Sequence, residues 1–143
     1  MKIKNSDVEE LAFFLLNMKL KGKENRMRNK FIRHLQKHLN EMQESHKELL
    51  SEFCELEADG NFKTVEKDGK KFYDVNNVAG FQSEFEKLME EFFYLPSDEG
   101  NKQMILTVKD LILNTEEEFS GKEALKYEAY CEIFEDEYVE IIG

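Results

Sequence analysis

Hydrophobic and polar residues alternate along most of the chain with the period of an α-helix. Near the start, the apolar positions recur every three or four residues and so share one helix face: Val8, Leu11, Leu15 and Met18. Ser6 followed by Glu9 is a capping-box pattern, in which two side chains satisfy free backbone N–H groups. We therefore expect a helix that begins at Ser6 and ends near Gly22.

A longer apolar seam predicts one long helix over about residues 24–58. After Phe31 its apolar positions follow a heptad-like spacing: Leu35, Leu39, Met42, Leu49, Phe53 and Leu56. We expect these six residues to be buried against the other helices or against a second copy, so that a monomer and a homodimer are equally favoured. His46 is a polar member of the seam, and Gly60 is suited to the turn that follows the helix.

The period changes to two between about residues 62 and 75, which predicts a β-hairpin. Asp68-Gly69 is a strong signal for a two-residue turn. That turn would place the following pairs opposite one another: Val65 with Phe72, Glu66 with Lys71, Lys63 with Asp74, and Phe62 with Val75. Apolar residues then oppose apolar ones and acids oppose bases, which supports this register.

Three further helices are predicted in the second half of the chain. The first begins at Asn76 or Asn77, and its inward residues are Phe81, Phe85, Leu88 and Phe92. The second, after Pro96 and Gly100, carries Met104, Val108, Leu111 and Ile112. The third opens at a capping box, Ser120 with Glu123, and carries Leu125, Tyr127, Cys131 and Phe134. The prediction is a mainly α single domain over residues 1–143, with about five helices and one inserted hairpin.

Composition agrees with a folded helical domain. Hydrophobic residues make up 41% of the 143 residues, with one Pro and seven Gly. Cys54 and Cys131 each lie within an apolar helical pattern, which favours buried thiols in the cytoplasm over a disulfide or a reactive pair. Asp7 and Glu9 interrupt the first apolar segment, so we expect a helix there and not a leader peptide. No run approaches the roughly 18 apolar residues of a membrane span, and no membrane association is expected.

The net charge of −11 is distributed unevenly. Residues 1–37 carry ten Lys or Arg against four acids, whereas residues 84–143 carry five against seventeen. The basic stretch at 19–37 could bind phosphates, but the acidity of the whole molecule disfavours nucleic acid as a partner. Alternatively, the basic stretch packs near the acidic half of the chain and partly neutralises its charge. The acidic half is alternatively a binding surface itself, even one that mimics the phosphates of DNA.

If charge drives binding, the contacts should come from residues 110–140. The candidate partner-binding residues are Asp110, Glu117, Glu128, Glu132 and Glu135. Exposed ion pairs are individually weak, so several together would steer association and the complex would weaken with salt. If binding is instead insensitive to salt, an apolar patch at Phe92, Phe93 and Tyr94 beside Pro96 is the next candidate.

Catalytic and metal-binding patterns are mostly missing. His34, His38 and Glu41 share a helix face, but three ligands without a metalloprotease motif favour ordinary surface histidines. A calcium loop counted from Asp59 would have Thr64 and Lys70 where Gly and Glu are needed. The sequence also has no phosphate-binding loop, dinucleotide fingerprint or nucleophile elbow. We therefore expect no enzymatic activity, no cofactor and no metal.

Several segments resemble a family of small bacteriophage and prophage proteins of Gram-positive bacteria, a domain of unknown function. They are residues 16–31 (LNMKLKGKENRMRNKF), 108–113 (VKDLIL), 118–124 (EFSGKEA) and 127–132 (YEAYCE). The long acidic helix, the Asp-Gly turn and the helix with Phe-Glu-Lys-Leu-Met-Glu-Glu are also similar, so the resemblance covers nearly the whole chain. It implies a phage or prophage origin and supplies no catalytic or binding residues.

The function that these observations favour is that of a phage-encoded, non-enzymatic accessory protein. It would bind a protein partner stoichiometrically in the host bacterial cytoplasm, for example as an inhibitor of a host or anti-phage defence protein. The alternative is a virion assembly or tail-associated structural component, for which a long helical rod would be suited.

Overall fold

The computed structural model describes the backbone of residues 1–142 and the side chains of residues 1–135. Over this part of the chain it has five helices and two antiparallel two-stranded sheets. In chain order the elements are β1 (Lys2–Lys4), α1 (Asn5–Leu16), α2 (Gly22–Phe53), β2 (Thr64–Lys67), β3 (Lys70–Tyr73), α3 (Val78–Glu90), β4 (Phe92–Tyr94), α4 (Glu99–Leu113) and α5 (Gly121–Ile142). The mainly helical fold with one long helix and a hairpin is as predicted.

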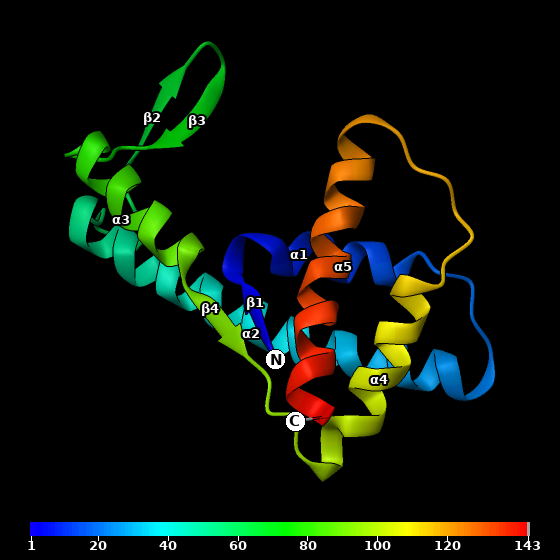
Figure 1. Ribbon diagram of the computed structural model, residues 1–143. Coiled ribbons are helices and arrows are strands. Elements are labelled where there is room, and N and C mark those ends of the chain that lie inside the picture. Colours follow the sequence, from blue (N-terminus) through cyan, green and yellow to red (C-terminus); the bar gives the residue numbers. More distant parts are fainter. Residues whose placement is uncertain (143) are drawn as a thin grey trace.

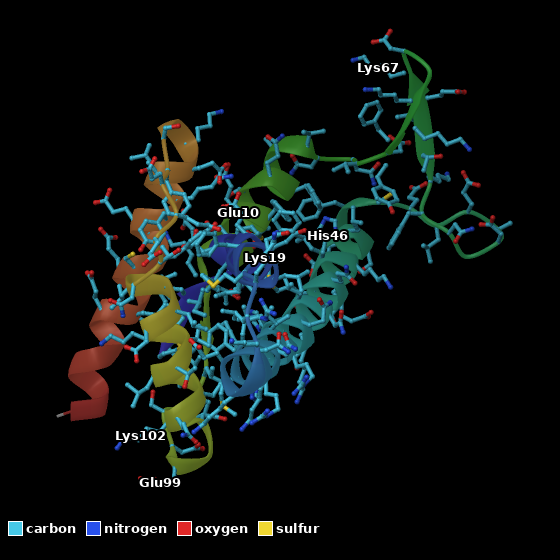
Figure 2. All side chains as sticks on the ribbon, turned by 90° about the vertical axis from the view of Figure 1, so that its right-hand side faces the viewer. Glu10, Lys19, His46, Lys67, Glu99 and Lys102 are labelled. Atoms are coloured by element: carbon cyan, nitrogen blue, oxygen red, sulfur yellow. The ribbon has the colours of Figure 1, made fainter. Side chains whose placement is uncertain are left out.

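The long helix α2 organises the molecule. Its 32 residues make a rod of about 48 Å, and α1, α3 and α4 all contact it. Figure 1 shows α4 and α5 beside the first half of the rod and α3 along the second half, from which the β2–β3 hairpin projects. In Figure 2, Lys67 near the hairpin tip lies at the opposite end of the molecule from Glu99 and Lys102 of α4.

The buried core lies between α1, the first half of α2, α4 and α5. Its fully enclosed side chains include Ile3, Val8, Leu11, Leu15, Phe31, Leu35, Met104, Ile105, Val108, Ile112 and Phe134. The rings of Phe31 and Phe134 meet near its centre, with their centroids 5.7 Å apart. The inward residues predicted for α4 are confirmed, with Leu111 half-buried, and so are Val8, Leu11 and Leu15 of α1. Met18, predicted on the same face, is half-buried and lies beyond the end of α1.

The predicted burial of the α2 seam is only partly confirmed. Leu35 is buried, but Leu39, Met42, Leu49 and Phe53 are half-buried. Leu56 is wrong as a core residue, since it is 57% exposed and lies beyond the helix. The helix ends at Phe53, and not near residue 58, because the next residues enter β-bridges that connect Cys54 with Val75 and Leu56 with Phe62.

The hairpin has the predicted turn and register. Val65 pairs with Phe72 and Glu66 with Lys71. Asp68 and Gly69 have φ angles of 55° and 78°, as a two-residue turn of this type requires. The predicted pairing of Phe62 with Val75 is wrong, because both residues form bridges to the segment that follows α2.

We expect Gly69→Val to destabilise the hairpin by roughly 1 kcal/mol or more, because a β-branched residue resists positive φ. Gly69→Asn is the matched control, since asparagine tolerates this conformation. Amide hydrogen exchange of residues 64–73 measures the difference. Equal protection in the two variants would contradict the assigned turn.

The third helix, α3, begins after Asn77, which is one of the two predicted capping residues. The side chain of Asn77 accepts a hydrogen bond from the backbone N–H of Gly80. Phe81, Phe85 and Leu88 are half-buried. The prediction for Phe92 is wrong, because α3 ends at Glu90 and Phe92 belongs to strand β4.

Because of the β1–β4 sheet, the first helix also starts at a different residue than predicted. Ile3 pairs with Phe93, and the side chain of Asn5 donates to the backbone oxygen of Leu88 at 2.8 Å. Asn5 is buried by these contacts and is the first residue of α1, so the capping box predicted at Ser6 is wrong. The helix also ends earlier than predicted, at Leu16, and Gly22 begins α2.

Helix α5 begins at Gly121, next to the predicted start. Phe134 is buried, while Tyr127 and Cys131 are half-buried against the core. Leu125 is wrong as an inward residue, because it is 68% exposed. Cys54 and Cys131 are free thiols.

Candidate interaction surface

The basic stretch at residues 19–37 is mostly exposed, but one of its arginines lies inside the fold. Arg28 is buried and closes the end of α1, with Nη1 donating to the backbone oxygens of Leu15 at 2.6 Å and Met18 at 2.8 Å. Its Nη2 and Nε donate to the side chains of Asn25 and Asn29. Free carbonyls at a helix C-terminus attract cations, so this arginine serves the fold.

The histidines of α2 are engaged in packing. His38 stacks on Phe93 with a centroid distance of 4.4 Å, and its Nε2 lies 2.6 Å from Oδ1 of Asn5. Because that oxygen can only accept, Nε2 carries the proton. Burial lowers the pKa of His38, and the negative charge of Glu41 offsets part of this shift. Among the side chains that the structure describes, no group of three or more His, Cys, Asp or Glu is arranged to hold a metal ion.

His34 and His46 also have defined surroundings. Burial, together with Lys30, Lys37 and Arg33, lowers the pKa of His34. His46 is half-buried and meets Phe85 edge-on, with ring centroids 5.4 Å apart. It packs between α2 and α3 on the half-buried seam, outside the main core.

The structure divides the predicted acidic surface into two. Asp110 and Glu117 line a polar hollow of about 650 Å³ between the end of α4 and residues 17–24, where Lys19 lies on the other wall. This part of the basic stretch therefore does pack near the acidic half. Glu128, Glu132 and Glu135 are exposed at i, i+4 and i+7 on one face of α5.

An apolar groove lies where α1, α2 and α3 meet. It has a volume of about 510 Å³, and Phe13 and Leu16 of α1 form one wall. The other two helices contribute Ile32, Leu39, Met42, Phe85, Leu88 and Met89. The groove exists because α1 covers only the first half of α2, so that the half-buried seam residues Leu39 and Met42 remain accessible.

An acidic hollow of about 770 Å³ adjoins the groove on the other side of α1. Its floor contains the rings of Phe14, Phe119 and Tyr130. Five carboxylates line it against one lysine: Glu9, Glu10, Glu117, Glu118 and Glu123 against Lys126. Of the residues predicted from the charge pattern, Glu117 lies here.

Phe13 joins these two depressions. It lines both, as does Glu9, and its side chain is 68% exposed. Leu16, one turn further along, is 59% exposed. We call the apolar groove and the acidic hollow together the Phe13 surface. Large apolar side chains exposed beside one another in this way are typical of protein-binding sites.

Electrostatics keep the hollow negative despite its lysine. Lys126 Nζ lies 3.3 Å from Glu10 Oε1 and 3.7 Å from Glu123 Oε1, and the hydrogen bond and charge of Glu10 raise the pKa of Lys126. Burial raises the pKa of Tyr130 to about 12, so its hydroxyl stays neutral. Glu9, Glu117 and Glu118 line the hollow beside the rings of Phe14, Phe119 and Tyr130.

Sequence reasoning missed Phe13 although a signal was present. Residues 11–16 read Leu-Ala-Phe-Phe-Leu-Leu without a polar residue, so apolar side chains surround the helix on every side. A short helix that is apolar all round and packs on only some sides must expose part of that surface.

The alternative apolar patch is present in a reduced form. Phe93 is half-buried under His38, while Phe92 and Tyr94 are 39% and 68% exposed on β4. Lys2 covers the ring of Phe92 at 4.7 Å from its centroid. The patch is smaller than the Phe13 surface, with a hollow of about 210 Å³ beside it.

In the part of the chain that the structure describes, none of the helices is both long enough and apolar enough to cross a bilayer. No protein-family model matches the chain, and no curated protein or solved structure matches it significantly.

Proposed function

We propose that this protein is a phage-encoded, non-enzymatic accessory protein that binds a protein partner stoichiometrically through the Phe13 surface. The observation that carries the proposal is the 68% exposure of Phe13 between an apolar groove and an acidic hollow. A phenylalanine in this position adds little to the stability of the chain, because most of its ring remains in water. Its contribution would come when a partner covers it.

The chemistry of the surface supports binding in preference to catalysis. The groove and the hollow supply apolar contact area, aromatic rings and negative charge, which are the components of a recognition surface. The most specific form of the proposal is an inhibitor of a host or anti-phage defence protein in the bacterial cytoplasm. The resemblance to small phage proteins supports the origin, and the surface supports the mode of action.

The test is quantitative recovery of partners from a lysate of a Gram-positive host by the immobilised chain. The wild-type protein is expected to retain one host protein in an equimolar amount. The Phe13→Ala variant is expected to retain at least about tenfold less of that protein. Phe72→Ala is the matched control, because that side chain is 51% exposed on the distant hairpin. Equal recovery by wild type and Phe13→Ala would overturn the proposal.

The projecting hairpin favours a second candidate function. Val65, Phe72 and Tyr73 are exposed on an arm that stands away from the helical body, which suits an assembly contact within a virion or a tail (Figure 1). This candidate predicts that the protein is found in purified particles. It also predicts that Phe72→Ala impairs particle assembly and that Phe13→Ala does not.

A further inference from the structure

We infer that the Phe13 surface receives a basic amphipathic helix of the partner protein. The apolar side of that helix would occupy the groove, and its Lys or Arg residues would face the acidic hollow. The inference rests on the proposed function and adds the chemical class of the binding segment.

The walls of the groove determine the conformation of the occupant. All three walls are helices, in which the backbone N–H and C=O groups are already bonded internally. A partner strand would find no free sheet edge there to pair with, so the bound segment must satisfy its own backbone groups, as a helix does. Met42 and Met89 line the groove, and methionine side chains adapt readily to the shape of an apolar helix face.

The charge around the groove determines the sign of the occupant. Glu9 lies in both depressions, and Glu117 and Glu118 stand at the far side of the hollow. A partner helix with apolar residues beside Phe13 would therefore have its adjacent turns close to these carboxylates and to the aromatic rings of the hollow. Lysine or arginine gains there from ion pairing and from contact with ring faces.

The same charge argues against a second copy of this chain as the occupant. Each copy carries a net charge of −11, so an isologous contact across the Phe13 surface would bring the same carboxylates together. The hairpin of a second copy is the competing occupant, because Val65 and Phe72 share a face with Lys67 and Lys70. That arrangement would be heterologous and would show as concentration-dependent growth in sedimentation.

The probe is a synthetic amphipathic helix made of leucine and lysine, titrated into the full chain labelled for NMR. A second peptide of the same pattern with glutamate in place of lysine is the charge control. We expect shift changes to centre on Phe13, Leu39 and Phe85, and the leucine–lysine peptide to bind at least about tenfold more tightly than the control. Equal binding of the two peptides, or shifts centred elsewhere, would overturn the inference.

Two matched pairs of substitutions separate the acidic hollow from general acidity. Glu117→Gln with Glu118→Gln is expected to weaken peptide binding roughly two- to tenfold, chiefly by slowing association. Glu132→Gln with Glu135→Gln removes the same charge from exposed positions of α5 that do not line the hollow. We expect this second pair to change binding less than the first, and equal effects would overturn the inference.

The outcomes also distinguish this inference from the proposed function. If the glutamate peptide binds as tightly as the lysine peptide while Phe13→Ala still abolishes recovery of a host protein, the helix class is wrong and the proposed function stands. If the lysine peptide binds at the Phe13 surface while Phe13→Ala recovers the host protein normally, the proposed function is wrong. Chain growth in sedimentation that Phe72→Ala abolishes would assign the groove to a second copy and overturn the inference.

Discussion

Phe31→Ala is expected to lower the free energy of unfolding by about 3–5 kcal/mol. The ring is fully buried and contacts Phe134 across the centre of the core, where α2 meets α5. Truncation removes the transfer free energy of the ring and leaves a cavity that rigid helices cannot close. Because a domain of this size is stable by about 5–15 kcal/mol, urea denaturation should show a clearly lowered midpoint.

The control for this prediction is the same substitution at an exposed position. Phe13→Ala should change the free energy of unfolding by less than about 1 kcal/mol, because the ring is 68% exposed. A large loss of stability in Phe13→Ala would mean that Phe13 holds the fold together. That result would also remove the argument that its exposure serves a partner.

Arg28→Ala is expected to lower the free energy of unfolding by about 2–4 kcal/mol. The guanidinium satisfies the last carbonyls of α1 and holds the turn between α1 and α2, while remaining only 6% exposed. Removing it leaves the oxygens of Leu15 and Met18 without their charged donor. Thermal unfolding followed by circular dichroism measures the effect.

Two variants define what Arg28 contributes. Arg28→Lys should recover only part of the stability, because an ammonium group cannot span the positions that the planar guanidinium reaches. Arg26→Ala is the matched control, since Arg26 is exposed on the same turn of α2, and its effect should be within about 0.5 kcal/mol. Equal destabilisation by Arg26→Ala would show that general positive charge, and not the buried hydrogen bonds, is what matters.

Local sequence patterns correctly predicted the elements that are determined by residues close together in the chain. The Asp68-Gly69 turn sets its own backbone angles, and the pairing of Val65 with Phe72 follows from the turn. The spacing of Met104, Val108 and Ile112 was sufficient to place α4 against the core. In each case the determining residues lie within one or two turns of each other.

Errors arose where distant segments compete for the same residues. Strand β1 exists because Ile3 pairs with Phe93, ninety residues away, and that pairing moves the start of α1 to Asn5. The end of α2 is likewise set by the bridge from Cys54 to Val75. Helical periodicity continues through Leu56, so the sequence contained no local sign of the earlier end.

The candidate surface likewise depends on contacts between segments that are distant in the sequence. The excess of acids in the second half was visible in the sequence, but Glu117 and Glu132 appeared equivalent there. Glu117 lies in the loop after α4, whose Phe119 contacts Phe14 of α1, whereas Glu132 lies on α5 and does not line the hollow. The apolar groove depends on three helices at once, and no single stretch of sequence contains it.

Photo-crosslinking from position 13 in host cells tests the central claim most directly. A benzophenone amino acid in place of Phe13 should yield one covalent product, consisting of this chain and one partner molecule, whereas the same group at position 72 should yield none. The crosslinked peptide of the partner should be a basic amphipathic helix. Equal crosslinking from both positions, or a partner captured only from position 72, would contradict binding through the Phe13 surface.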